Sequence, residues 1–221
     1  MGDFYKFEET RMKKYFSALA TLLTLTACYN GNGQKAETAA IPDGKAIVEN
    51  IMTRTSIRQY TDQTISADTI ETLLRAGMAA PSAVNKQPWH FVAVTSRDKM
   101  KEMAATNPNA RMLEQAPLTI VVCGDMQKTL KDEAHDSWIL DCSAATENIL
   151  LAAHALGLGA VWTALYLREE RSKGAIEALK LPEHIVPLCA IIIGYPAEQP
   201  EPKDKWKPEN VSYNEFGRKA E

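Results

Sequence analysis

The sequence lacks an excess of positive charge, and it contains few cysteines and histidines. Its 221 residues include 25 Lys and Arg against 28 Asp and Glu. The broad positive field that nucleic-acid binding needs is missing, so no nucleic-acid partner is predicted. The four cysteines form no Cys-x-x-Cys pair and the four histidines no His-Glu-x-x-His motif, so we predict no metal site. A hydrophobic content of 45% predicts one globular core.

The motifs of several common enzyme classes are also missing. No Gly-x-x-x-x-Gly-Lys-Ser/Thr loop and no Gly-x-Ser-x-Gly elbow occurs, so P-loop phosphate binding and α/β-hydrolase catalysis are not supported. Gly157-Leu158-Gly159 resembles part of a dinucleotide-binding motif. It follows a predicted helix and precedes a predicted strand, which inverts the order that this motif requires.

The first 28 residues resemble the export signal of a bacterial lipoprotein. Lysines follow Met12, and the apolar run from Phe16 to Leu25 is shorter than the roughly 20 residues that span a bilayer. The run ends in Ala27-Cys28, which resembles a box where a cysteine is lipidated. A lipid on Cys28 would hold the protein in the cell envelope, facing the periplasm or exterior, and would be its only membrane contact. The alternative is a frayed amphipathic helix on a cytoplasmic protein.

The same hypothesis divides the chain into three parts. Residues 1–28 would be an upstream extension and signal, with Met12 as the true start, and residues 29–42 a flexible tether. Residues 43–221 would form the folded domain and an extended C-terminal tail.

Helices and strands alternate in the predicted domain. Ser66 is a good N-cap with Asp68 in the first turn behind it, Ser96 starts another helix, and Gly157 can end a third. The predicted helices are 43–52, 66–78, one from residue 96, 138–156 and 168–180, and the predicted strands are 90–95, 118–124, 160–164 and 186–194.

Three cysteines remain in the domain. Cys123, Cys142 and Cys189 each lie within an apolar run, so we predict buried spectators, and a disulfide between two of them stays open.

A cationic segment follows the first helix. If the chain is extended there, alternation places Arg54, Ser56 and Arg58 on one face. Two guanidinium groups and a hydroxyl suit a phosphate or an electron-rich heterocycle. A solvated basic turn is the alternative. The Pro-bounded loop Ala80–Phe91 carries small and amide side chains that let backbone approach a planar ligand closely. It could equally be a plain helix-to-strand connection with Trp89 in the core.

Taken together, these segments resemble the FMN-dependent nitroreductase family over roughly residues 47–207. The motifs occur in the family's order: Arg54-x-Ser56-x-Arg58, Pro81-Ser82-x-x-Asn85-x-Gln87-Pro88-Trp89, the stretch from Asp141 to Trp162, Gly194-Tyr195-Pro196 and Lys203-x-Lys205. The resemblance implies an α+β fold, with a central mixed β-sheet flanked by helices, in an intertwined homodimer with two FMN sites at the subunit interface.

The resemblance also implies which residues hold the cofactor. Arg54, Thr55, Ser56 and Arg58 of one subunit, with Lys203 and Lys205, would bind the phosphate, the ribityl chain and the pyrimidine edge. Pro81, Ser82, Ala83 and Asn85 would come from the other subunit. The strand Trp162-Thr163-Ala164 would lie along the reactive edge of the flavin with an N–H near N5, and Arg111, with Asn107 or Asn109, would match a further polar contact. Ala83 stands where many members have serine, and lysines stand in the tail where arginine is frequent.

The activity that the resemblance implies is the passage of hydride from NAD(P)H through FMN N5 to a nitroaromatic or quinone, by a ping-pong cycle. The chemistry then belongs to the cofactor, and no catalytic side chain is expected. A flavin-dependent dehalogenase-like enzyme on the same fold and a non-catalytic flavin-binding lipoprotein are the alternatives.

Overall fold

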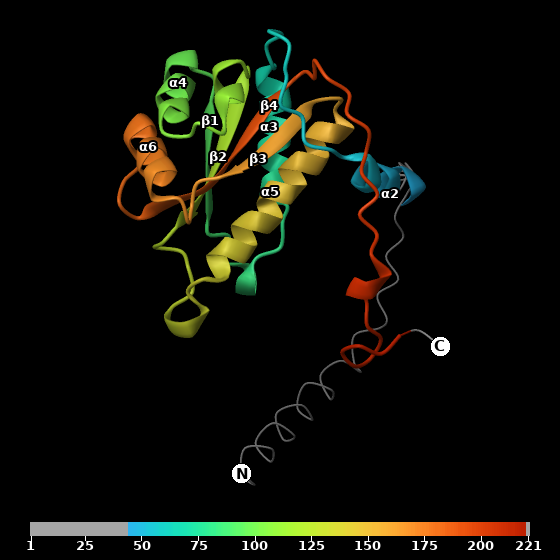
Figure 1. Ribbon diagram of the computed structural model, residues 1–221. Helices are drawn as coiled ribbons and strands as arrows, with labels where there is room; N and C mark the ends of the chain where they lie inside the picture. The colour runs from blue at the N-terminus through green and yellow to red at the C-terminus, as the bar shows by residue number, and fades with distance from the viewer. Residues whose placement is uncertain (1–43, 220–221) are drawn as a thin grey trace, which may run out of the picture. The chain divides into compact units, whose positions relative to one another are not determined.

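The computed structural model describes residues 44–219 (Figure 1). The predicted signal, the tether and Asp43 lie outside the described residues. The helices are α2 (Gly44–Thr53), α3 (Ala67–Met78), α4 (Arg97–Ala105), α5 (Ser137–Ala155) and α6 (Glu169–Leu179). The strands are β1 (Trp89–Val94), β2 (Leu118–Asp125), β3 (Gly159–Ala164) and β4 (Ile185–Gly194). Short 3-10 turns are η1 (Ala83–Asn85), η2 (Arg111–Glu114), η3 (Asp132–Ala134) and η4 (Pro208–Asn210).

The predicted helix ends are confirmed by their caps. Ser66 Oγ accepts from the N–H of Thr69 at 3.2 Å, and Ser96 Oγ accepts from the N–H of Lys99 at 3.4 Å. Gly157 follows α5 with φ 73°, a left-handed conformation that glycine adopts without steric cost. Local capping chemistry therefore decides where these helices start and stop.

The four strands form one sheet in the order β1-β2-β4-β3, and every neighbouring pair is antiparallel. The predicted mixed character is limited to one isolated parallel bridge, between Ser56 and Ala160. The central strand β2 is buried along all eight residues. Its continuous apolar run reflects helices packed on both faces of the sheet.

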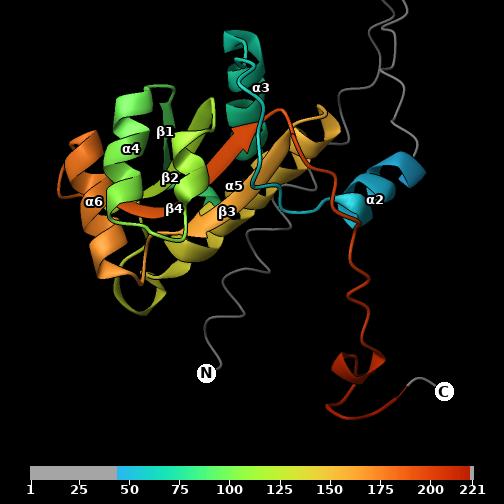
Figure 2. The ribbon, with the colours of Figure 1, turned by 45° about the horizontal axis from the view of Figure 1, so that its top comes forward.

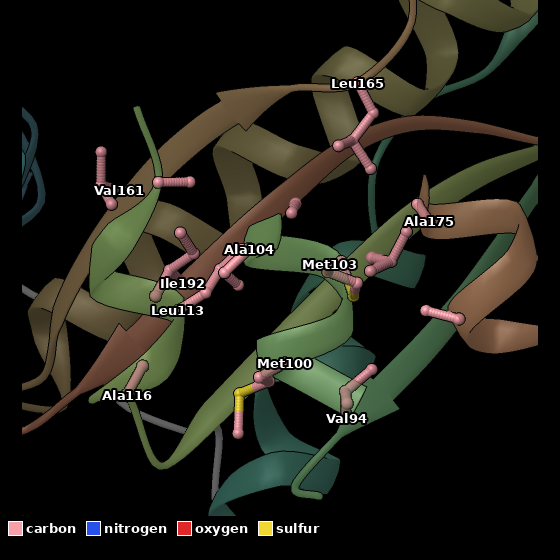
Figure 3. Close-up of a cluster of buried hydrophobic side chains, with 14 of the residues drawn as sticks. Val94, Met100, Met103, Ala104, Leu113, Ala116, Val161, Leu165, Ala175 and Ile192 are labelled. Carbon is pink, nitrogen blue, oxygen red and sulfur yellow. The ribbon is translucent and has the colours of Figure 1, made fainter. Parts of the chain in front are cut away.

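Each face of the sheet has its own hydrophobic core. Figures 1 and 2 show α4 and α6 on one face and α5 with α3 on the other. Figure 3 shows Met100 of α4 beside Val94 of β1, Ala104 of α4 near Ile192 of β4, and Ala175 of α6 near Met103, all within one cluster. On the other face, Trp138 and other buried residues of α5 pack on β2 and β4.

The three domain cysteines are free and buried, as predicted. Burial raises the pKa of the Cys123 and Cys189 thiols from 9.0 to about 12 and raises that of Cys142 as well. Since the thiolate is the reactive form, these thiols are chemically quiet in the folded protein. Among residues 44–219, no helix has the length and apolar character needed to cross a membrane.

We predict that Cys123, Cys142 and Cys189 resist an aromatic disulfide reagent at pH 8 in a Cys28→Ser variant and react completely in guanidinium chloride. A thiol whose pKa is raised by folding favours the folded state at low pH, because the unfolded chain ionises first. The free energy of unfolding should therefore fall as the pH rises from about 9 towards 12. Rapid labelling of the native protein would contradict the burial.

Candidate functional site

The segment from Arg54 to Tyr60 lies along the start of β3. The N–H of Ile57 donates to the carbonyl of Ala160 at 3.1 Å, and Ser56 forms the parallel bridge with the same residue. A Cβ on Gly159 would lie 2.6 Å from Ile57 Cγ2. This close approach requires glycine, so Gly159 brings the segment against the sheet.

The other side of the segment is held by the chain that follows β4. Glu198 Oε1 accepts from the N–H groups of Arg58, at 2.5 Å, and Gln59, at 3.1 Å. The N–H of Ala197 donates to the carbonyl of Gln59 at 2.9 Å. A carboxylate that receives two backbone N–H groups makes stronger hydrogen bonds than a neutral acceptor. The backbone at Arg58 is therefore fixed from both sides.

Tyr60 anchors the end of the segment in the core. Its hydroxyl oxygen lies 2.6 Å from the carbonyl oxygen of Ile57 and 2.9 Å from that of Ile192. Burial raises the pKa of this phenol, so the hydroxyl remains a donor.

Alternation along the segment separates its apolar and cationic side chains. The side chain of Ile57 is buried, and Thr55 and Ile57 line a cavity of about 340 Å³ with Thr53 and His154. Arg54, Ser56 and Arg58 are not among the residues that line this cavity, which agrees with a period of two.

The arginines differ in their surroundings. Arg54 is 18% exposed, and its Nε lies 3.6 Å from Glu147 Oε1 on α5. Arg58 is exposed to solvent.

The outer edge of β3 carries free backbone donors beside this segment. The carbonyl of Ala160 faces outward to Ile57, whereas the N–H of Leu165 donates inward to the carbonyl of Leu188. Because backbone groups alternate along a strand, the N–H groups of Trp162 and Ala164 point to the outer edge. No other described element pairs with them. Thr163 points its backbone groups to β4 instead.

The Pro81–Gln87 loop is tied to α5. Asp141 Oδ1 accepts from the N–H of Ala83 at 2.9 Å. Ser82 Oγ accepts from the N–H of Gln87 at 3.0 Å, and Asn85 Oδ1 accepts from the side-chain amide of Gln87 at 3.2 Å. Hydrogen bonds inside the loop and one to α5 therefore set its shape.

The two groups of predicted binding residues lie against different turns of α5, the loop at Asp141 and Arg54 at Glu147. The loop contacts α5 at Asp141, whereas Thr53, just before the cationic segment, lies 3.0 Å from Nε2 of His154 near the helix end. Asp141 and His154 are about 20 Å apart along α5, at roughly 1.5 Å per residue.

The remaining predicted residues lie elsewhere. Arg111 opens η2, next to α4, and is exposed. Lys203 and Lys205 are exposed in the tail and make no hydrogen bond or ion pair to any other described residue. No group of three His, Cys, Asp or Glu side chains among residues 44–219 could hold a metal ion.

Comparison with protein-family models identifies the family. The model of the nitroreductase family matches residues 51–107 and 101–195, which is more than half of the chain. The chain belongs to the nitroreductase family.

Individual relatives agree with this assignment. A protein of Archaeoglobus fulgidus named "Putative NADH dehydrogenase/NAD(P)H nitroreductase" is 46% identical over 164 residues, 73% of this chain and 93% of that protein. A crystal structure of the same name from Bacteroides thetaiotaomicron is 46% identical with a TM-score of 0.74, over 78% of this chain and 99% of that one. An FMN-dependent nitroreductase structure from Clostridium difficile is 30% identical with a TM-score of 0.71, over 76% and 99%. These similarities confirm the predicted fold.

Sequence reasoning missed two carboxylates that shape the site. Glu198 holds the backbone of the cationic segment and Asp141 holds the Pro81–Gln87 loop. Neither forms part of a local pattern with the backbone that it contacts. No sequence signal could have paired them without the fold.

We predict that Glu198→Ala lowers the free energy of unfolding by about 1–2 kcal/mol, because two backbone donors lose their charged acceptor. Glu198→Gln keeps one acceptor oxygen and should lose less. Glu201→Ala, at an exposed glutamate three residues on, is the matched control and should stay within about 0.5 kcal/mol of the wild type. Chemical denaturation measures the free energy of unfolding of all three variants. If Glu198→Ala and Glu201→Ala lose equal amounts, the hydrogen bonds of Glu198 to the backbone do not stabilise the protein.

Proposed function

We propose that this protein is an FMN-dependent oxidoreductase that passes hydride from NAD(P)H to a nitroaromatic or quinone acceptor. The single observation that carries the proposal is the bond between Ile57 and Ala160, which puts the Arg54–Arg58 cations beside the free edge of β3. One surface thus offers charge for a phosphate and backbone donors for a planar ring. The names of the relatives, which include NAD(P)H nitroreductase and FMN-dependent nitroreductase, support the cofactor and the donor.

The residues present fit FMN. Arg54 and Arg58 supply guanidinium groups for the phosphate, and the hydroxyl of Ser56 adds a donor on the same face. The free N–H groups of Trp162 and Ala164 can donate to the edge of the ring, and one of them would contact N5. The N–H of Ala164 lies farther along the strand from Ala160, where the cationic segment is bonded. Lys203 and Lys205 are exposed and free to add positive charge.

Bound FMN would supply the redox chemistry, taking hydride from NAD(P)H and passing it to the acceptor in a ping-pong cycle at one shared place. The chain's own residues bind and orient the cofactor. None of them needs to serve as a general acid or nucleophile.

We further propose that the site is completed by a second copy of the chain in a homodimer. The Pro81–Asn85 part of the loop contacts α5 at Asp141, whereas the cationic segment contacts it at Glu147, and the family resemblance assigns the two groups to different subunits. Helix α2 buries none of its residues, and it exposes the apolar side chains of Ile47, Val48, Ile51 and Met52. These recur at helical spacing on one face, which suits packing against a partner.

A dehalogenase-like enzyme on this fold would need an extra segment that closes over the substrate. Between Pro108 and Ser137 the chain contains β2 and two short 3-10 turns, which leaves little for such a lid. A simple reductase is therefore favoured. A non-catalytic flavin-binding protein would bind the same cofactor. Only a measurement of NADH oxidation distinguishes it from a reductase.

The test is to purify the protein, load it with FMN and record the visible spectrum, the molar mass by light scattering, and the oxidation of NADH with menadione or a nitrofuran. We expect a yellow dimer that oxidises NADH only with an acceptor present. Arg54→Glu puts a carboxylate beside the phosphate and should raise the Kd for FMN at least about 100-fold while the far-UV circular dichroism is unchanged.

Arg168→Glu is the matched control, since it makes the same charge change at an exposed residue before α6. It should bind FMN like the wild type. Full FMN retention by Arg54→Glu would refute the phosphate assignment. A yellow protein that never oxidises NADH would favour the binding module, and a flavin-loaded monomer would refute the two-subunit site.

We also propose that a lipid on Cys28 anchors the protein in the cell envelope, with cytoplasmic location as the alternative. The support is the order of charge, apolar run and cysteine in residues 12–28. Metabolic labelling with a fatty acid should mark the wild type and leave Cys28→Ala unlabelled. Absence of label from both proteins would end the anchor hypothesis.

A further inference from the structure

We propose that Asp141 is a positioning residue that holds the Pro81–Gln87 loop in a strained conformation for FMN binding. This inference rests on the proposed function, because it gives that loop its ligand. Asp141 acts through the backbone of Ala83 and is not itself placed against the cofactor.

Three residues of the loop have left-handed backbone, and Val84 is the one for which this conformation is most unfavourable. Val84 has φ 42° and ψ 34°, Asn85 has φ 57° and Gln87 has φ 50°. Left-handed backbone is unfavourable for residues other than glycine and is most unusual for a β-branched residue such as valine. The Val84 side chain is 77% exposed, so its own packing does not offset this strain. Backbone strain of this kind persists only where the surroundings impose it, and it concentrates at functional sites.

Asp141 forms a hydrogen bond to the loop from α5, outside the loop itself. Asp141 is 6% exposed, and its Oδ1 accepts from the N–H of Ala83, directly before Val84. The other backbone bonds of the loop are local, from the N–H of Asn85 to the Ser82 carbonyl and from the N–H of Lys86 to the Ala83 carbonyl. Among the described residues, Asp141 is thus the side chain that connects Ala83–Gln87 to another element of the fold.

The chemistry of this bond suits a holding role. A charged acceptor strengthens a hydrogen bond, and a nearly water-free site strengthens it further. Asp141 lies on α5, a 19-residue helix with eight buried residues, so the loop is held to one of the most rigid parts of the fold. Removing the carboxylate would leave only the hydrogen bonds inside the loop to hold Val84 in its left-handed conformation. The loop would then relax away from the shape that presents Ala83 and Asn85.

The first measurement is the Kd for FMN of the cofactor-free full-length protein, from the quenching of FMN fluorescence. Asp141→Ala should raise the Kd about ten- to hundredfold, the range for losing a hydrogen bond to a charged group. Asp141→Asn keeps an acceptor oxygen and should raise it only a few-fold. Thr146→Ala is the matched control, because it removes a buried hydrogen bond to the Cys142 carbonyl on the same helix without touching the loop. Its Kd should equal that of the wild type.

The second measurement tests the strain directly. Glycine adopts φ 42° without steric cost, so Val84→Gly in the Asp141→Ala background should recover at least about threefold of the lost affinity. The same exchange in the wild type should change the Kd less. In the FMN-free protein, trypsin should cleave after Lys86 faster in Asp141→Ala than in the wild type, and Thr146→Ala should be cleaved at the wild-type rate. This measurement shows whether the loop has loosened, independently of flavin binding.

The outcomes separate the two proposals. If the wild type binds no FMN, the proposed function fails, and this inference fails with it. If the wild type binds FMN and Asp141→Ala binds it equally well, or loses affinity that Val84→Gly does not restore, only the role of Asp141 is refuted. If Asp141→Ala does not fold, Asp141→Asn provides the test. Its Kd for FMN should exceed that of Thr146→Ala, and an equal Kd would refute the role of Asp141.

Discussion

The candidate site depends on the fixation of one short segment, Arg54–Tyr60, between two parts of the chain that are distant in sequence. Ala160 of β3 bonds it on one side and Glu198, after β4, on the other. Gly159 permits the contact because any larger residue would clash with Ile57. The backbone that carries the arginines is therefore already ordered before an anion binds. Less conformational entropy is lost on binding than if this segment were a flexible loop.

Two carboxylates act in the same way on two different segments. Glu198 accepts backbone N–H groups of the cationic segment, and Asp141 accepts one from the Pro81–Gln87 loop. Each joins an irregular segment to a regular part of the fold through a charged hydrogen bond. Both carboxylates accept from backbone N–H groups, whereas the carboxylate that lies beside the Arg54 guanidinium is Glu147.

Much of the fold could be predicted from the sequence because the deciding interactions are local. The caps at Ser66 and Ser96, the stop at Gly157 and the apolar runs of β2 and β4 act within a few residues, and the structure has these elements within one or two residues of the predicted bounds. The sheet pairing was less accessible. All four strands pair antiparallel, and the expected mixed character comes down to the bridge at Ser56.

By itself, the sequence determined which elements form and which cysteines are buried, because capping and hydrophobicity act over short distances. Only the tertiary structure decided that the N–H groups of Trp162 and Ala164 lie on a free edge and that the loop is held to Asp141. Those facts arise from contacts between residues many positions apart. Packing of the whole domain selects such contacts, and no local pattern encodes them.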